Sequence, residues 1–131
     1  MIVIDSSYTL ALVMPDERRP ASMAQVMQDR LATPAIWPLE IANAMRSSMR
    51  RRRLARSQVD GLFTQLSILE VDVVSTGHAL PQRHFEAAQV HDLTPYDAMY
   101  LELALQWRCP LATRDAELAS AARRAGVTVH D

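Results

Sequence analysis

The first seven residues constrain the fold of this chain more than any other stretch. Residues 2–4 are three consecutive β-branched apolar residues with no polar residue between them, as is typical of a short strand buried on both faces of a parallel sheet. Asp5 follows directly, and ligands of such sheets bind just beyond the carboxyl ends of the strands. Asp5 is therefore a candidate functional residue. As an alternative that the sequence leaves open, Asp5 or Ser6 caps the next helix.

The rest of the chain alternates short apolar segments with longer amphipathic ones. Its 131 residues, 49% of them hydrophobic, suffice for a sizeable core, and we expect a single domain over residues 1–131. This alternation favours right-handed crossovers and an α/β fold with a short, mainly parallel central sheet flanked by helices. Strands are expected at 2–4, within 32–37, and at 71–74, 110–113 and 127–129, and helices at 8–14, 21–31, 38–53, 58–69, 79–91, 96–107 and 116–125.

Three further acids lie at the starts of predicted helices. Asp97 stands on the apolar stripe of the helix at 96–107, where burying a carboxylate without a partner is costly. Glu40 and Asp115 lie in or just before the first turns of their own helices. A crossover helix runs antiparallel to the strands that it connects, so its first turn lies at the carboxyl edge of the sheet. We therefore expect four acids to face this edge, namely Asp5, Glu40, Asp97 and Asp115.

A cluster of carboxylates suits a hard divalent cation. Two carboxylates about 4 Å apart repel by roughly 4 kcal/mol at an effective dielectric constant of about 20, so several together need a compensating charge. Oxygen ligands favour Mg²⁺ or Mn²⁺ over zinc, and these ions activate water for in-line displacement at phosphorus. The cluster thus indicates phosphodiester hydrolysis. The hydroxyls of Ser6 and Thr113 are candidates for orienting water or phosphate, with ordinary turn and cap hydrogen bonding as the alternative.

Four segments, in this order and spacing, resemble those of PIN-domain ribonucleases, most closely the VapC toxins of bacterial type II toxin–antitoxin modules. Each motif is short, but the series spans essentially the whole chain. The segments are Met1-Ile-Val-Ile-Asp-Ser-Ser7, Pro34-Ala-Ile-Trp-Pro-Leu-Glu-Ile-Ala-Asn-Ala44, Leu93-Thr-Pro-Tyr-Asp-Ala-Met-Tyr-Leu-Glu-Leu-Ala104 and Leu111-Ala-Thr-Arg-Asp115.

The resemblance implies a three-layer PIN-like fold and a magnesium- or manganese-dependent endoribonuclease. It also implies a homodimer that a cognate antitoxin holds inactive by wrapping its C-terminal segment around the toxin. Arg114, between Thr113 and Asp115, is longer than the usual small residue there and can alter access to the site. The acids that the resemblance assigns to catalysis and metal binding are Asp5, Glu40, Asp97 and Asp115.

Basic residues gather in one segment although the formal net charge of the chain is only -1. All 14 basic residues are arginines, and six of them lie between residues 46 and 56. Helical spacing predicts Arg46, Arg50 and Arg53 on one face, where they can contact RNA phosphates or the antitoxin. The alternative, a solvated helix end at which cations offset the dipole, stays open.

The composition also predicts a compartment and argues against other classes. A single cysteine, an acidic start and the lack of a long apolar run favour a cytoplasmic protein with no membrane contact. A phosphoacceptor receiver is disfavoured because the chain contains no lysine. The three glycines cannot form the loop of a nucleotide-binding enzyme. A catalytically silent PIN-like module that only binds a partner remains the alternative function.

Overall fold

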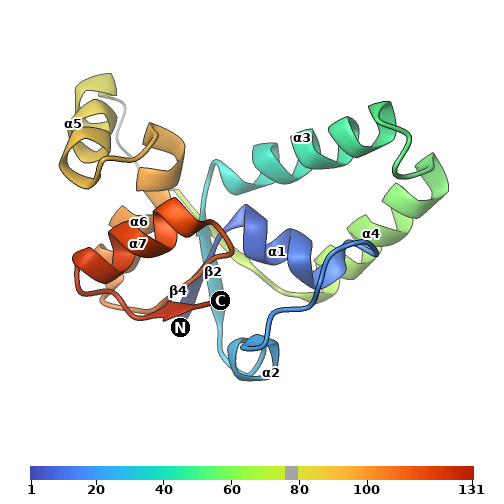
Figure 1. Cartoon of the computed structure of the whole chain (residues 1–131), viewed down its shortest axis with the longest axis horizontal. Helices are drawn as coiled ribbons and strands as arrows, with labels where there is room; N and C mark the ends of the chain where they lie inside the picture. Colours follow the sequence, from blue (N-terminus) through green and yellow to red (C-terminus); the bar gives the residue numbers. More distant parts are fainter. Residues whose placement is uncertain (76–79) are drawn as a thin grey trace.

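The computed structural model describes residues 1–75 and 80–131, in which helices and short strands alternate (Figure 1). The strands are β1 (Ile2–Ile4), β2 (Leu31–Pro34), β3 (Asp72–Val74), β4 (Leu111–Ala112) and β5 (Val129–His130). The helices are α1 (Ser6–Val13), α2 (Met23–Val26), α3 (Trp37–Arg50), α4 (Arg56–Ile68), α5 (Pro81–His91), α6 (Pro95–Trp107) and α7 (Ala116–Arg124). None of these helices is both long and apolar enough to cross a membrane.

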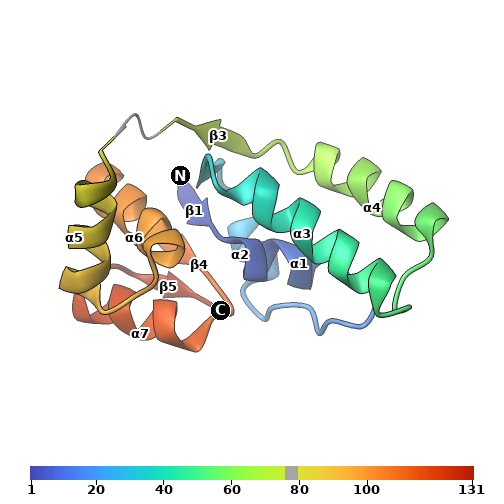
Figure 2. The same ribbon diagram turned by 90° about the horizontal axis from the view of Figure 1, so that it is seen from above.

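The strands form one sheet in the order β3-β2-β1-β4-β5, and every neighbouring pair is parallel. Because β1 lies at the centre and runs parallel to β2 and β4, the carboxyl ends of these three strands lie side by side. The residues that follow the strands therefore lie at a common edge of the sheet. Figure 2 shows the sheet between two groups of helices, α1 to α4 on one side and α5 to α7 on the other. The expected α/β fold with a parallel central sheet flanked by helices is therefore confirmed.

The core has one apolar layer on each face of the sheet. In β1, Ile2 and Ile4 pack into the layer beneath α1, α3 and α4, whereas Val3 packs into the layer beneath α6 and α7. Successive side chains of a strand point to opposite faces, so a strand with both faces covered needs an unbroken apolar run. This explains why the chain begins with three consecutive β-branched residues.

The expected helix at 21–31 is wrong. Only the single turn of α2 is helical there, and Leu31 belongs to β2, where it pairs with Ile2. Leu31 and Ala32 are buried in the sheet, and this tertiary pairing prevails over the helical pattern. Pro34 ends β2, so its missing N–H removes a possible ladder donor only at the last position of the strand.

Helix boundaries differ from the expectations around α3 and α4. The helix expected at 38–53 ends at Arg50, since Arg52 adopts a left-handed conformation with φ of 57°. Arg53 therefore does not share a helical face with Arg46 and Arg50. The next helix begins at Arg56, two residues before its expected start at residue 58. The helix expected to begin at residue 79 begins at Pro81, and residue 79 itself lies outside the described residues.

Candidate functional site

Asp5 lies at the carboxyl end of β1 and is almost fully buried, with 3% of its surface exposed. It is the N-cap of α1, where its Oδ1 accepts a hydrogen bond of 2.8 Å from the backbone N–H of Tyr8. The Ser7 hydroxyl contacts both carboxylate oxygens at 2.8 Å, and the Thr113 hydroxyl donates to Oδ2 at 2.6 Å. Asp5 thus caps a helix and also lies at the sheet edge, so the two alternatives for this residue are compatible.

Burial makes the negative charge of Asp5 costly. It raises the pKa of this carboxyl from 3.8 to about 6, although the hydrogen bonds from Thr113, Tyr8 and Ser7 act in the opposite direction. The negative charge of Asp97 raises the pKa further. The hydrogen bonds therefore orient the carboxylate without fully offsetting the loss of water around it.

Asp115 is linked to Asp5 through the Thr113 hydroxyl. The backbone N–H of Asp115 donates to Thr113 Oγ1 at 3.0 Å, and that same hydroxyl donates to Asp5. Asp115 is also the N-cap of α7, because its Oδ1 accepts from the backbone N–H of Leu118 at 2.8 Å. The parallel pairing of β1 with β4 brings these segments together from positions more than 100 residues apart.

Glu40 lies in the first turn of α3 and is held by a tyrosine that sequence reasoning missed. The hydroxyl of Tyr100, on α6, donates a hydrogen bond to Glu40 Oε1. Tyr100 is 1% exposed, and burial together with the neighbouring Glu40 raises the pKa of its phenol. The available signal was spacing, since Tyr100 comes three residues after Asp97 and so shares its helical face.

Asp97 is half-buried in the first turn of α6, and its backbone N–H donates to the Thr94 hydroxyl at 3.2 Å. Burial raises the pKa of Asp97, and the negative charges of Asp115, Glu40 and, less strongly, Glu117 raise it further. Since Asp97 also raises the pKa of Asp5, the side chains from these separate segments lie within electrostatic range of one another.

The donor set at this edge fits a hard cation, because it is all oxygen and its negative charges destabilise one another. In the described ranges, however, no three acidic, histidine or cysteine side chains are already arranged around one ion position. Protein donors occupy Asp5, one oxygen of Glu40 and one oxygen of Asp115. Among the described hydrogen bonds, the second oxygens of Glu40 and Asp115 accept none, so they can face an ion while the bonded oxygens hold these carboxylates in place.

The two auxiliary hydroxyl candidates occupy different environments. Thr113 is fully buried and already bridges Asp5 and Asp115. Ser6 begins α1 and lies near Tyr100, whose pKa it lowers. The serine hydroxyl in contact with Asp5 belongs to Ser7 rather than to Ser6. Sequence reasoning missed Ser7, which also accepts from the backbone N–H of Arg114 at 2.9 Å.

Comparison with known families matches residues 2–124 to the PIN domain. The chain belongs to the PIN domain family. This PIN domain is 29% identical over 120 residues to Ribonuclease VapC3 of Pyrobaculum aerophilum, and the alignment covers 90% of this chain and 92% of the relative. The family resemblance inferred from the four motifs is thereby confirmed.

Two solved structures share the fold of this PIN domain. PAE2754 from Pyrobaculum aerophilum superposes with a TM-score of 0.68 at 23% identity, over 98% of this chain and 87% of that chain. FitAcB from Neisseria gonorrhoeae gives 0.69 at 16% identity, over 100% of this chain and 97% of that chain. At these identities the likeness supports the fold alone.

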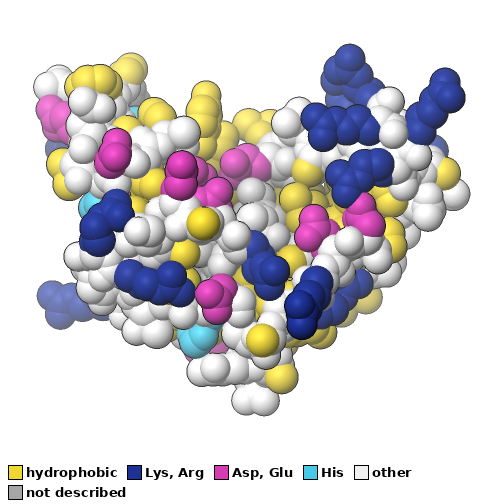
Figure 3. Space-filling view, in the orientation of Figure 1, with side chains coloured by type: hydrophobic (Ala, Val, Ile, Leu, Met, Phe, Trp, Pro, Cys, Tyr) yellow, Lys and Arg dark blue, Asp and Glu magenta, His cyan; other side chains and the backbone are white. Residues whose placement is uncertain are grey.

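The arginine cluster of this PIN domain, defined as the arginines between residues 46 and 56, is exposed. Figure 3 shows these basic side chains over the end of α3 and the start of α4, across a hollow from acidic side chains. Arg53 pairs with Asp16 and Arg56 with Asp60. Arg46 and Arg50 are exposed on α3 and point away from the core.

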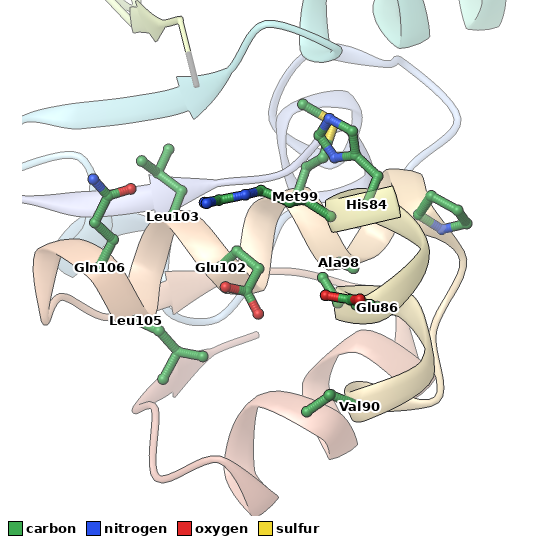
Figure 4. A pocket seen from close by; sticks show the side chains of 12 residues that line it. His84, Glu86, Val90, Ala98, Met99, Glu102, Leu103, Leu105 and Gln106 are labelled. Carbon is green, nitrogen blue, oxygen red and sulfur yellow. The ribbon is translucent and has the colours of Figure 1, made fainter. Parts of the chain in front are cut away.

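A cavity of about 750 Å³ lies between α5 and α6 (Figure 4). Its lining includes His84, Glu86, Met99 and Glu102, and the four predicted acids are not among the lining residues. The cavity is therefore separate from the acidic edge, and its volume says nothing about chemistry there.

Proposed function

We propose that this PIN domain is a metal-dependent endoribonuclease that acts as the toxin of a type II toxin–antitoxin system. The observation that carries the proposal is that acids from separate segments are held at one edge of the sheet. The Thr113 hydroxyl bridges Asp5 and Asp115. Tyr100 of α6, the helix that carries Asp97 in its first turn, hydrogen-bonds to Glu40. Membership of the PIN family and the similarity to Ribonuclease VapC3 support the same reaction.

The residues proposed to hold Mg²⁺ or Mn²⁺ and to carry catalysis are Asp5, Glu40, Asp97 and Asp115. When bound, the ion supplies positive charge that activates water and offsets the charge developing at phosphorus during in-line displacement. This assignment explains why a stable fold keeps acids whose negative charges are otherwise unfavourable to one another.

The surrounding residues contribute orientation. Ser7 and Thr113 hydrogen-bond the Asp5 carboxylate, and the Tyr100 hydroxyl bonds to Glu40. Because the hydrogen bonds of Thr113 go to protein groups, we assign Thr113 to holding Asp5. Ser6 is the residue that we propose to orient water or the scissile phosphate. Arg114 borders the same edge and is proposed to limit access for large substrates.

The substrate and partners follow from the charges around the site. Arg46 and Arg50 are proposed to contact phosphates of an RNA strand that crosses the hollow toward the acids, with Arg53 already engaged by Asp16. A cognate antitoxin is the proposed inhibitor, and the toxin is proposed to act as a cytoplasmic homodimer. A silent partner-binding module is the alternative that lack of activity would favour.

The proposal is tested by incubating the purified protein with a panel of transfer, ribosomal and messenger RNAs. Cleavage in Mg²⁺ or Mn²⁺, its loss in chelator and the mapping of new RNA ends to discrete positions would support a sequence-selective endoribonuclease. Growth arrest on induced expression, relieved by co-expression of the antitoxin, would support the toxin role. An intact RNA panel with either metal would contradict the nuclease assignment.

A further inference from the structure

A tyrosine hydroxyl lies among the acids of the proposed metal site. Tyr100 belongs to α6, is 1% exposed, and packs its ring into the core layer beneath α6 and α7. Its hydroxyl leaves that apolar layer and donates a hydrogen bond to Glu40 Oε1 on α3. The residue thus connects α6, which carries Asp97, with α3, which carries Glu40.

Two acids of this edge, Asp5 and Glu40, are held in different ways. Asp5 has a short side chain, and its carboxylate accepts hydrogen bonds from two hydroxyls and one backbone N–H. Glu40 has a longer side chain with more rotatable bonds, and among the described contacts Tyr100 is its only side-chain donor. Glu40 is also partly exposed, so its carboxylate has space to turn away from the sheet edge. The tyrosine hydroxyl is therefore the group that selects one orientation of this carboxylate.

A phenylalanine would fill the same core position, because the ring makes the apolar contacts and only the oxygen reaches Glu40. The hydroxyl consequently has a role that packing does not explain. Outer hydrogen bonds that orient metal ligands typically change metal affinity or activity by about 10- to 100-fold.

We propose that Tyr100 is a positioning residue that fixes the orientation of the Glu40 carboxylate for binding of the divalent cation. This inference rests on the proposed function, since it assumes that Glu40 is a metal ligand. On this inference α6 contributes two groups to the site. Asp97 is one proposed ligand, and Tyr100, about one turn later, donates the hydrogen bond that aligns Glu40 of α3.

The test measures Mn²⁺ binding to purified proteins by calorimetry, with RNA cleavage as a second readout. Tyr100→Phe is expected to weaken Mn²⁺ binding by about 10-fold or more and to retain the far-ultraviolet circular dichroism of the unaltered protein. Tyr96→Phe is the matched control, because it removes the same hydroxyl from the same helix at a side chain that is 58% exposed. Among the described hydrogen bonds the Tyr96 hydroxyl contacts no acid, so this control is expected to bind Mn²⁺ normally.

A double-mutant cycle separates positioning from general structural damage. If Tyr100 acts through Glu40, adding Tyr100→Phe to Glu40→Gln should change Mn²⁺ affinity by less than about twofold. An equal loss in both backgrounds, or a Tyr100→Phe protein that does not fold, would overturn the inference. Normal Mn²⁺ binding by Tyr100→Phe would overturn it and leave the proposed function intact. An unaltered protein that binds no Mn²⁺ would overturn both.

Discussion

The Thr113 hydroxyl donates a hydrogen bond of 2.6 Å to Asp5 Oδ2, joining the ends of β4 and β1. Thr113 Oγ1 also accepts from the backbone N–H of Asp115 at 3.0 Å, so one buried hydroxyl connects two of the proposed metal ligands. Loss of this hydroxyl would be destabilising, because Asp5 Oδ2 would keep only its bond from Ser7 and the Asp115 N–H would lose its partner.

Thr113→Val is expected to lower the free energy of unfolding by about 1–3 kcal/mol, because it keeps the shape but leaves Asp5 Oδ2 and the Asp115 N–H without this partner. Urea unfolding in metal-free buffer measures the change. Thr113→Ser keeps the hydroxyl and is expected to restore much of the loss. A Thr113→Val protein as stable as the unaltered one would contradict the bridging role.

The stability of the metal-free protein is expected to fall as pH rises from about 4 to about 6. Because burial raises the pKa of Asp5 from 3.8 to about 6, the folded state binds this proton more tightly than the unfolded chain, and the stabilisation is lost as pH rises through this range. The shift corresponds to about 3 kcal/mol. The raised pKa of Asp97 likewise makes stability fall as pH rises. The lowered pKa values of Asp16 and Asp29 instead make stability fall as pH drops below about 4.

Chemical denaturation in chelator at several pH values measures this dependence. Asp5→Asn removes the titrating group and is expected to flatten the curve. A curve of the unaltered protein that already matches Asp5→Asn would show that the Asp5 carboxyl is not perturbed by burial.

Reversing the charge of Arg50 is expected to weaken RNA binding and reduce its salt dependence by roughly one unit of slope, as for the loss of one phosphate contact. Arg108→Glu is the matched control, because Arg108 is exposed at the far end of α6 and undergoes the same charge change. Fluorescence anisotropy with a labelled RNA, using the Asp97→Asn background to prevent cleavage, measures both. Equal losses of RNA affinity in Arg50→Glu and Arg108→Glu would indicate that the arginine cluster is a solvated surface that does not contact RNA.

Much of the fold follows from local patterns in the sequence. The apolar run of β1 required a sheet covered on both faces, and the layers around Ile2, Val3 and Ile4 provide this cover. The same reasoning predicted that Asp5 follows a strand end at the carboxyl edge, because parallel strands deliver their following residues to one side. These features depend on periodicity and strand direction, which a sequence contains.

Other features depend on tertiary contacts that local patterns do not encode. Phe63 is spaced one helical turn from Val59 and Leu66, yet it is 44% exposed because α4 buries only Val59, Leu62 and Leu66. The left-handed Arg52 ends α3 without the glycine or asparagine that usually marks such a position. The bond from Tyr100 to Glu40 joins two helices and becomes visible only when both are packed.

The most direct test of the account compares RNA cleavage by Asp97→Asn and by Asp60→Asn in Mn²⁺. Both variants make the same chemical change, but Asp60 is exposed on α4 and pairs with Arg56. Asp97→Asn is expected to lose at least about 100-fold in cleavage rate, since removing a metal ligand should cost no less than removing its outer partner, while Asp60→Asn keeps full activity. Undiminished cleavage by a folded Asp97→Asn protein would contradict catalysis by the acids at the sheet edge.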